Sequence, residues 1–276
     1  MKHSLNERLK RPGIVVAPGC HDVLGARIVA RAGFEAVYMT GNGLSASLIG
    51  APDLGLLTMS EMVERGHAFA GAVDIPVIAD ADTGYGNVNN VRRTVRAYEA
   101  AGVAAIHLED QVTPKRCGAM TGLVLVSPEE HAEKISEACS ARTDPELLII
   151  GRTDARIPNG FADALARGRA YARAGANLVL IEMLQSEDEI AEAVQSIDAP
   201  LMFNFVDGKA PPLTAARFER LGVKLLSFPV SSTLAYARMM TSFVKHIRVH
   251  GTTAGSPQPL MPLAEYDTVL GRSNYA

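Results

Sequence analysis

The chain has 276 residues, of which 47% are hydrophobic and 21% are charged, and its formal net charge is −3 at pH 7. This composition supports a large buried core and excludes the low-hydrophobicity, high-charge pattern of disordered chains. A charge so close to zero, with Lys and Arg scattered along the chain, argues against nucleic acid or a membrane surface as a partner. The length fits one α/β barrel of roughly 250 residues, so we expect a single domain spanning residues 1–276.

The N-terminal stretch MKHSLNERLKRPG lacks the apolar segment of a signal peptide. No apolar run approaches the roughly 18 residues needed to span a bilayer. The three cysteines, Cys20, Cys117 and Cys139, are widely spaced and form no C-x-x-C motif, so neither a disulfide framework nor a zinc site is indicated. We therefore expect a cytoplasmic protein with reduced thiols.

Eight short apolar runs alternate with segments of helical spacing. In chain order the runs are GIVVAP, AVYMTG, PVIADAD, AIHLED, LLIIGRTD, LVLIEM, PLMFNF and LLSFPV. The segments between them, such as NVRRTVRAYEAAG and PEEHAEKISEACSA, are rich in alanine, and several are followed by glycine. Continuous apolar strands joined by helices indicate a parallel sheet covered on both faces, and eight such units predict a closed (β/α)8 barrel.

The last segment, about 251–276, breaks this alternation with Gly, Ser and Pro before a final short apolar pattern. We expect it to form a C-terminal helical arm that packs on a neighbouring subunit or exchanges with it.

Polar residues recur where the predicted strands end, which is the edge of a (β/α)8 barrel that carries function. They are Tyr38, Thr40, Asp80, Asp82, Glu109, Asp110, Arg152, Asp154, Glu182 and Asn204. One such residue means little, because Asp and Ser commonly cap helices. So many acids at one edge need a common partner, and a cation is the simplest one.

Four of the acids form a candidate metal site. Asp80 and Asp82 are two residues apart in IADADTGYG, so they leave the same face if the strand persists. With Asp53 and Glu109 they offer only oxygen ligands, which favours Mg²⁺ or Mn²⁺ over zinc. The alternative is that each acid caps a helix or pairs with a nearby arginine. His107 lies inside an apolar strand pattern, where a core histidine is expected more than a ligand.

The stretch YMTGNGLSAS has Gly41, Gly43 and Ala46 at the spacing of a dinucleotide-binding fingerprint. It follows the second strand, however, and IGAPDLG interrupts any long helix behind it, so we reject that interpretation. A nest of backbone N–H groups around Thr40, Gly41 and Asn42 that binds a carboxylate fits better. A glycine turn without a ligand is the alternative.

Segment 111–127, QVTPKRCGAMTGLVLVS, is longer than a typical connection between a strand and its helix, and we expect it to act as an active-site lid. Lys115 or Arg116 would favour the thiolate of Cys117 and offer charge to an anionic substrate. The alternative is that Cys117 is a buried filler, as free cysteines usually are.

Several of these stretches occur together in a recognisable order: YMTGNGLSAS, PDLG, DADTGYGN, HLEDQV, KRCG and RTDA. Over nearly the whole chain the pattern resembles the isocitrate lyase and phosphoenolpyruvate mutase superfamily. The resemblance implies a (β/α)8 barrel, usually tetrameric, that acts on small 2-oxo or 2-hydroxy acids. It also implies Mg²⁺ bound chiefly through Asp82, and through waters held by Asp53, Asp80 and Glu109.

The KRCG stretch is similar to that of the carbon–carbon lyases, such as methylisocitrate and dimethylmalate lyases. Sequences of carboxyvinyl-carboxyphosphonate phosphorylmutase share it. The lyases normally continue with histidine, whereas here Gly118 is followed by Ala119. An oxaloacetate decarboxylase-like enzyme and an enzyme acting on a P–C bond therefore remain alternatives to a lyase, and a non-catalytic barrel is a remote one.

The mechanism that these residues indicate is a metal-assisted retro-aldol cleavage of a small 2-hydroxy di- or tricarboxylic acid. Mg²⁺, which Mn²⁺ can replace, acts as the Lewis acid, and Arg152 helps to hold the carboxylate. Tyr38 takes the proton of the 2-hydroxyl, and Cys117 protonates the enolate-like product once the lid has closed. Lys115 completes the expected catalytic set. The expected substrate-binding set is Thr40, Gly41, Asn42, Gly118, Glu182 and Asn204.

Overall fold

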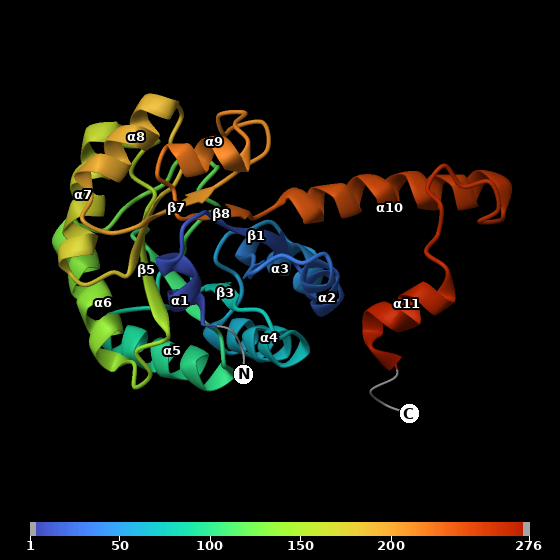
Figure 1. Ribbon diagram of the computed structural model, residues 1–276, viewed down its shortest axis with the longest axis horizontal. Coiled ribbons are helices and arrows are strands. Elements are labelled where there is room, and N and C mark those ends of the chain that lie inside the picture. The colour runs from blue at the N-terminus through green and yellow to red at the C-terminus, as the bar shows by residue number, and fades with distance from the viewer. Residues whose placement is uncertain (1–3, 273–276) are drawn as a thin grey trace.

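The computed structural model describes residues 4–272, which form a closed barrel of parallel strands surrounded by helices (Figure 1). The strands follow chain order around the barrel, and β8 pairs with β1 to close it. Their bounds are β1 Val15–Cys20, β2 Val37–Met39, β3 Val77–Asp80, β4 Ala105–Glu109, β5 Leu148–Thr153, β6 Leu178–Ile181, β7 Leu201–Asn204 and β8 Leu225–Phe228. The predicted (β/α)8 barrel is confirmed, with one strand in each apolar run.

Helices alternate with the strands along the chain, and most of them cover the outside of the barrel. Their bounds are α1 Leu5–Lys10, α2 Val23–Arg31, α3 Gly41–Ile49, α4 Met59–Ala72, α5 Val88–Ala101, α6 Pro128–Ala141, α7 Phe161–Arg173, α8 Glu187–Ser196, α9 Ala215–Arg220, α10 Ser231–His250 and α11 Leu263–Leu270. Side-chain caps begin many of them, as at α6, where Ser127 Oγ accepts a hydrogen bond from Glu130 N.

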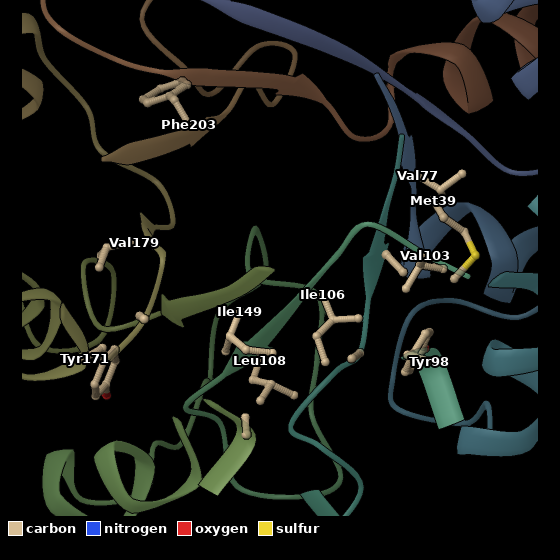
Figure 2. Packing of buried hydrophobic residues seen from close by; sticks show 14 of the residues in the cluster. Met39, Val77, Tyr98, Val103, Ile106, Leu108, Ile149, Tyr171, Val179 and Phe203 are labelled. Atoms are coloured by element: carbon tan, nitrogen blue, oxygen red, sulfur yellow. The ribbon is translucent and has the colours of Figure 1, made fainter. Parts of the chain in front are cut away.

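Two separate apolar layers hold the barrel together. Side chains such as Ile78, Ile150 and Met202 fill its interior, and Leu5 of α1 packs with them. A larger cluster lies between the strands and the helices, where Ile106 meets the surrounding side chains seen in Figure 2. Burial in both layers explains why the strands are continuously apolar instead of alternating.

The C-terminal arm begins earlier than predicted. Helix α10, which follows β8, extends away from the barrel, and α11 turns back beside α2 (Figure 1). Arg27 Nη1 donates to Leu270 O at 3.1 Å, and Arg31 Nη1 donates to Thr268 O at 3.2 Å, which ties α11 to α2. None of the residues of α10 is buried. The last part of the predicted arm, 273–276, lies outside the described residues.

Among residues 4–272, no helix is both long and apolar enough to cross a membrane.

Candidate active site

The carboxyl ends of the strands surround a cavity of about 210 Å³ at one mouth of the barrel. It brings together residues that are far apart in the sequence. Its lining consists of Tyr38, Thr40, Asn42, Asp53, Asp80, Cys117, Gly118, Ala119, Arg152, Glu182, Asn204, Val206, Pro229, Val230 and Leu234. Most of the predicted site residues are in this set. Gly41, Asp82, Glu109 and Lys115 lie around it without lining it.

The β3 strand ends at Asp80, so Asp82 does not share its face through strand alternation. Asp82 has a positive φ of 47° instead, and its backbone N–H donates to Asp80 Oδ1 at 3.0 Å. This turn keeps the two carboxylates together in a different way from the one expected. Burial raises the pKa of Asp82 to about 6, against the opposing charge of Lys115.

Lys115 faces the acids and not the thiol. Its side chain is 4% exposed, and Nζ lies 2.7 Å from Asp53 Oδ1 and 3.0 Å from Asp82 Oδ1. These carboxylates outweigh the effect of burial and hold the pKa of Lys115 well above its usual value. The ammonium group therefore ties segment 111–127 to the acidic floor of the cavity.

Cys117 lines the cavity and is half-buried. Burial, followed by the nearby Asp53 and Glu182 carboxylates, raises the pKa of the thiol. The prediction that adjacent cations favour the thiolate is therefore wrong, because Lys115 is bound to Asp53 and Asp82. A neutral thiol can donate a proton, but it is a poor nucleophile.

Arg152 is the central cation of the site. Its Nη2 donates to Asp154 Oδ1 at 2.8 Å, and its Nη1 lies 3.3 Å from Glu109 Oε2. The more distant contact, from Nε to Glu182 Oε2, is 4.0 Å long, and Nε itself is buried with no hydrogen-bond partner in the described part of the chain. One donor of this buried guanidinium therefore remains unsatisfied by the protein.

His107 is a site residue that the sequence did not reveal. Its Nε2 lies 2.6 Å from Tyr38 Oη and 3.6 Å from Asp80 Oδ1, and its ring is stacked on that of Tyr38. Burial lowers the pKa of His107 to about 4, and burial together with the charge of Asp80 raises that of Tyr38 well above its usual value. Both groups are therefore neutral. The pairing of Asp80 with His107 in the β3–β4 register is the signal that could have found it.

The predicted nest at the start of α3 is smaller than expected. Gly41 N–H donates to Asp80 Oδ2 at 3.3 Å, and Thr40 N–H donates to Cys20 O at 3.4 Å. These two predicted backbone donors are therefore already bonded to the protein. The third, the Asn42 N–H in the first turn of α3, has no such bond and could bind a ligand. Helix α3 has nine residues, in agreement with the rejection of a dinucleotide fold.

Glu182 and Asn204 lie side by side at the cavity wall. Asn204 Nδ2 donates to Glu182 Oε2 at 2.9 Å, and Ser227 Oγ donates to Asn204 Oδ1. The amide is thus held at both ends by neighbouring strands. Burial raises the pKa of Glu182, which favours a carboxyl group that can donate as well as accept.

Residues 117–119 of segment 111–127 line the cavity, and several independent contacts hold the segment in place. Gln111 bonds to both backbone groups of Arg116, at 2.8 and 2.9 Å, and reaches Asp154 Oδ2 at 3.1 Å. Cys117 N–H donates to Asp53 O at 3.0 Å, and Lys209 Nζ donates to Ala119 O. Sequence analysis missed Gln111 and Lys209, since most of their partners are backbone groups that no motif reports.

The chemistry of the acids fits a divalent cation, although no three His, Cys, Asp or Glu side chains form a ready-made metal-binding group within residues 4–272. Glu109 is fully buried, and neither of its carboxylate oxygens has a hydrogen-bond partner. Burial raises the pKa of its carboxyl group well above the usual value. Arg152 Nη1 forms an ion pair with Oε2 at 3.3 Å, but neither oxygen accepts a hydrogen bond, and a cation-bound water beside them would supply one.

Comparison with known proteins agrees with this geometry. The family model described as phosphoenolpyruvate phosphomutase matches residues 5–248. The 2,3-dimethylmalate lyase of Eubacterium barkeri is 45% identical over 97% of this chain and 93% of its own length.

Two solved structures extend the comparison. An oxaloacetate acetylhydrolase in complex with 3,3-difluorooxalacetate has a TM-score of 0.93 and 32% identity, over 99% of this chain and 93% of that one. A phosphonopyruvate hydrolase in complex with oxalate and Mg²⁺ has a TM-score of 0.88 and 33% identity, over 98% of this chain and 95% of that one.

The chain belongs to the phosphoenolpyruvate mutase and isocitrate lyase superfamily. It is an enzyme of the lyase and mutase class, whose members act on small carboxylic acids.

The contact between Gly118 and Arg152 provides a test of how segment 111–127 is seated. A Cβ at position 118 would overlap Asp154 Oδ1 and Arg152 Nη2. We predict that Gly118→Ala prevents this seating and raises the rate of tryptic cleavage at Arg116 by about tenfold, equivalent to about 1.4 kcal/mol of local stability. Gly71→Ala, at an α4 position with no atom within 4 Å, is the matched control and leaves cleavage unchanged. Equal cleavage of both variants would contradict the prediction.

Proposed function

We propose that the enzyme is a Mg²⁺-dependent carbon–carbon lyase. It cleaves a small 2-hydroxy di- or tricarboxylic acid by a retro-aldol reaction into a 2-oxo acid and a second carboxylic acid. The observation that supports this most strongly is that the Cys117 thiol, whose pKa is raised by burial, lines the same cavity as Arg152 and the buried acids. A cleavage that leaves a carbanion needs such an acid within reach.

Four carboxylates would hold the cation. On the family resemblance Asp82 binds it directly, and Asp53, Asp80 and Glu109 bind it through water. When bound, Mg²⁺ supplies Lewis-acid stabilisation of the negative charge that develops on the substrate oxygens. The unsatisfied oxygens of Glu109 support this assignment. Lys115 contacts both Asp53 and Asp82, and it would offset the repulsion between them beside a bound cation.

The remaining groups bind the substrate and move two protons. Arg152 Nε and the Asn42 N–H hold the carboxylate next to the bond that breaks. Tyr38 Oη receives the proton of the 2-hydroxyl while its own proton passes to Nε2 of His107, 2.6 Å away. The C2–C3 bond then breaks, and the Cys117 thiol protonates the carbon that leaves.

A second candidate is cleavage or decarboxylation of a 2-oxo diacid such as oxaloacetate. Ala119 favours it, because segment 111–127 brings no imidazole beside the thiol, where the carbon–carbon lyases normally have histidine. This reaction needs the metal and the carboxylate pocket but not the Cys117 acid. Reaction at a P–C bond is a third possibility within the same family.

We predict that Asp82→Ala abolishes activity, with a loss of at least about 1,000-fold, because direct metal ligation is removed. EDTA should abolish the activity of the unaltered enzyme too. Added Mg²⁺ should restore activity to the EDTA-treated enzyme but not to Asp82→Ala. Proton NMR with dimethylmalate, methylisocitrate, oxaloacetate and phosphonopyruvate measures both effects. Asp144→Ala, at an exposed residue outside the cavity, is the control. An active Asp82→Ala enzyme would contradict this metal site.

The same assay separates the candidates. Cys117→Ser should stop lyase turnover and spare a decarboxylase, because serine has no comparable acidity. Since burial raises the pKa of Cys117, the acid is protonated below that raised pKa, and lyase activity should persist to alkaline pH and fall only as the thiol ionises. A Cys117→Ser enzyme that still cleaves a 2-hydroxy acid would contradict the assigned acid.

We also propose that the protein is a homo-oligomer, in keeping with the tetramers expected from the resemblance, and that α10 packs on a second copy. Helix α10 carries exposed apolar residues, among them Met239 at 43%, Val244 at 51% and Val249 at 66%. We predict a multiple of the chain mass by light scattering, and a smaller particle for Val244→Asp combined with Val249→Asp. A single-chain mass for the unaltered protein would contradict this. Three free cysteines support a reducing compartment such as the cytoplasm.

A further inference from the structure

Asp110 is a buried carboxylate that the proposed mechanism does not use. It follows β4 directly, is fully buried and does not line the cavity. Its Oδ2 accepts hydrogen bonds from Tyr171 Oη at 2.7 Å and from Arg167 Nη1 at 3.1 Å, and both donors come from α7. Tyr171 lies in the apolar cluster between the strands and the helices (Figure 2). Desolvation offsets the attraction of a buried ion pair, so stability alone does not account for this arrangement.

Asp110 connects α7 to the cavity. Its Oδ1 accepts a hydrogen bond from the backbone N–H of Asp154 at 2.9 Å. The Asp154 side chain in turn accepts one hydrogen bond from Arg152 Nη2 at 2.8 Å and one from Gln111 Nε2 at 3.1 Å. The backbone that Asp110 fixes thus bears the carboxylate that orients Arg152, which lines the cavity.

Arg167 also joins the two ends of segment 111–127. Asp110 precedes the segment, and Val126 lies near its end. Val126 N–H donates to Asp110 O at 2.9 Å, and Arg167 Nη1, besides its bond to Asp110 Oδ2, donates to Val126 O at 2.9 Å. One guanidinium nitrogen therefore holds both ends of the loop, which limits the conformations open to the residues between them.

The contact at Nε of Arg167 is peripheral. Nε donates at 2.9 Å to Asp163 Oδ2, one turn earlier in α7, and the Asp163 side chain is 34% exposed. A pair at this spacing that is open to solvent adds little to stability. The contacts of Nη1 and of Nε can therefore be told apart by substitution.

We infer that Arg167 is a positioning residue for the reaction. Through Asp110 it sets the orientation of Arg152, and it holds together the ends of the segment that bears Cys117. A single buried side chain thereby places both the group that binds the substrate carboxylate and the proton donor. The inference deepens the proposed function, and it rests on that function for the roles of Arg152 and Cys117.

Two measurements that need no turnover test the inference. The first is the Kd of oxalate by calorimetry in Mg²⁺, since oxalate is the small dicarboxylate present with Mg²⁺ in the related hydrolase structure. The second is the rate of tryptic cleavage at Arg116. For Arg167→Met we predict about tenfold weaker binding of oxalate and about tenfold faster cleavage, because Arg152 is no longer oriented and the ends of the segment separate. A purely structural role would lower the folded fraction and leave the Kd of the folded enzyme unchanged.

Three further variants assign the effect. Arg167→Lys keeps the charge opposite Asp110 but not the guanidinium, and its Kd should lie within about threefold of that of the unaltered enzyme. Tyr171→Phe removes one hydrogen bond to Asp110 and keeps the ring, so it should weaken oxalate about threefold. It decides the test if Arg167→Met does not fold, since that variant leaves the charge of Asp110 buried and unpaired. Asp163→Ala removes the partner of Nε alone and is the matched control, with both measurements unchanged.

The failures of the two proposals are distinguishable. An unchanged Kd of oxalate or an unchanged rate of cleavage in folded Arg167→Met enzyme would overturn the inference, even if the enzyme cleaved 2-hydroxy acids. Effects of equal size in Asp163→Ala would overturn it as well, and so would an unchanged Kd in Tyr171→Phe where Arg167→Met does not fold. The predicted changes without cleavage of any 2-hydroxy acid would support the positioning role and overturn the proposed lyase reaction instead.

Discussion

The mouth of the barrel depends on the compensation of buried negative charge. Parallel strands bring acids to one edge, and carboxylates so close together repel unless cations or protons lie between them. Within residues 4–272, Lys115 and Arg152 are the lysine and arginine that pair with the acids of the candidate site. Each contacts more than one acid, so the arrangement of the site follows from the positions of these two side chains.

The two cations hold different parts of the structure. Arg152 comes from β5 and is fixed by the barrel, whereas Lys115 comes from segment 111–127 and joins that segment to Asp53 and Asp82. Charge compensation is thereby coupled to coverage of the site. The same segment carries Cys117, which lines the cavity, so the proposed acid would be in place when the segment covers the site.

Much of the fold could be predicted because it depends on local patterns. Continuous apolar runs separated by helical segments specify strands buried on both faces, and eight of them at this length leave few alternatives to a closed barrel. The residues at the strand ends follow from the same argument. Periodicity therefore located Tyr38, Asp80 and Arg152 without any knowledge of their partners.

The partners themselves could not be predicted, since they depend on register and on side-chain direction. His107 appeared to be a core residue because its strand is apolar, and its contact with Tyr38 exists only once β2, β3 and β4 are paired. Lys115 was expected beside the thiol because it is near Cys117 in sequence, but the stronger attraction of two carboxylates turns it away. Helical periodicity likewise cannot predict that α10 extends away from the barrel, because it reports only that a helix forms.

The central claim is that an acid of the protein, Cys117, protonates the carbon released by cleavage inside a closed cavity. Turnover of a 2-hydroxy acid in D₂O, followed by NMR of the acid released, tests it most directly. A single deuterium on one face of the cleaved carbon is the result predicted, because one fixed thiol delivers it. Deuterium distributed equally over both faces would mean protonation by bulk water, and would contradict the account.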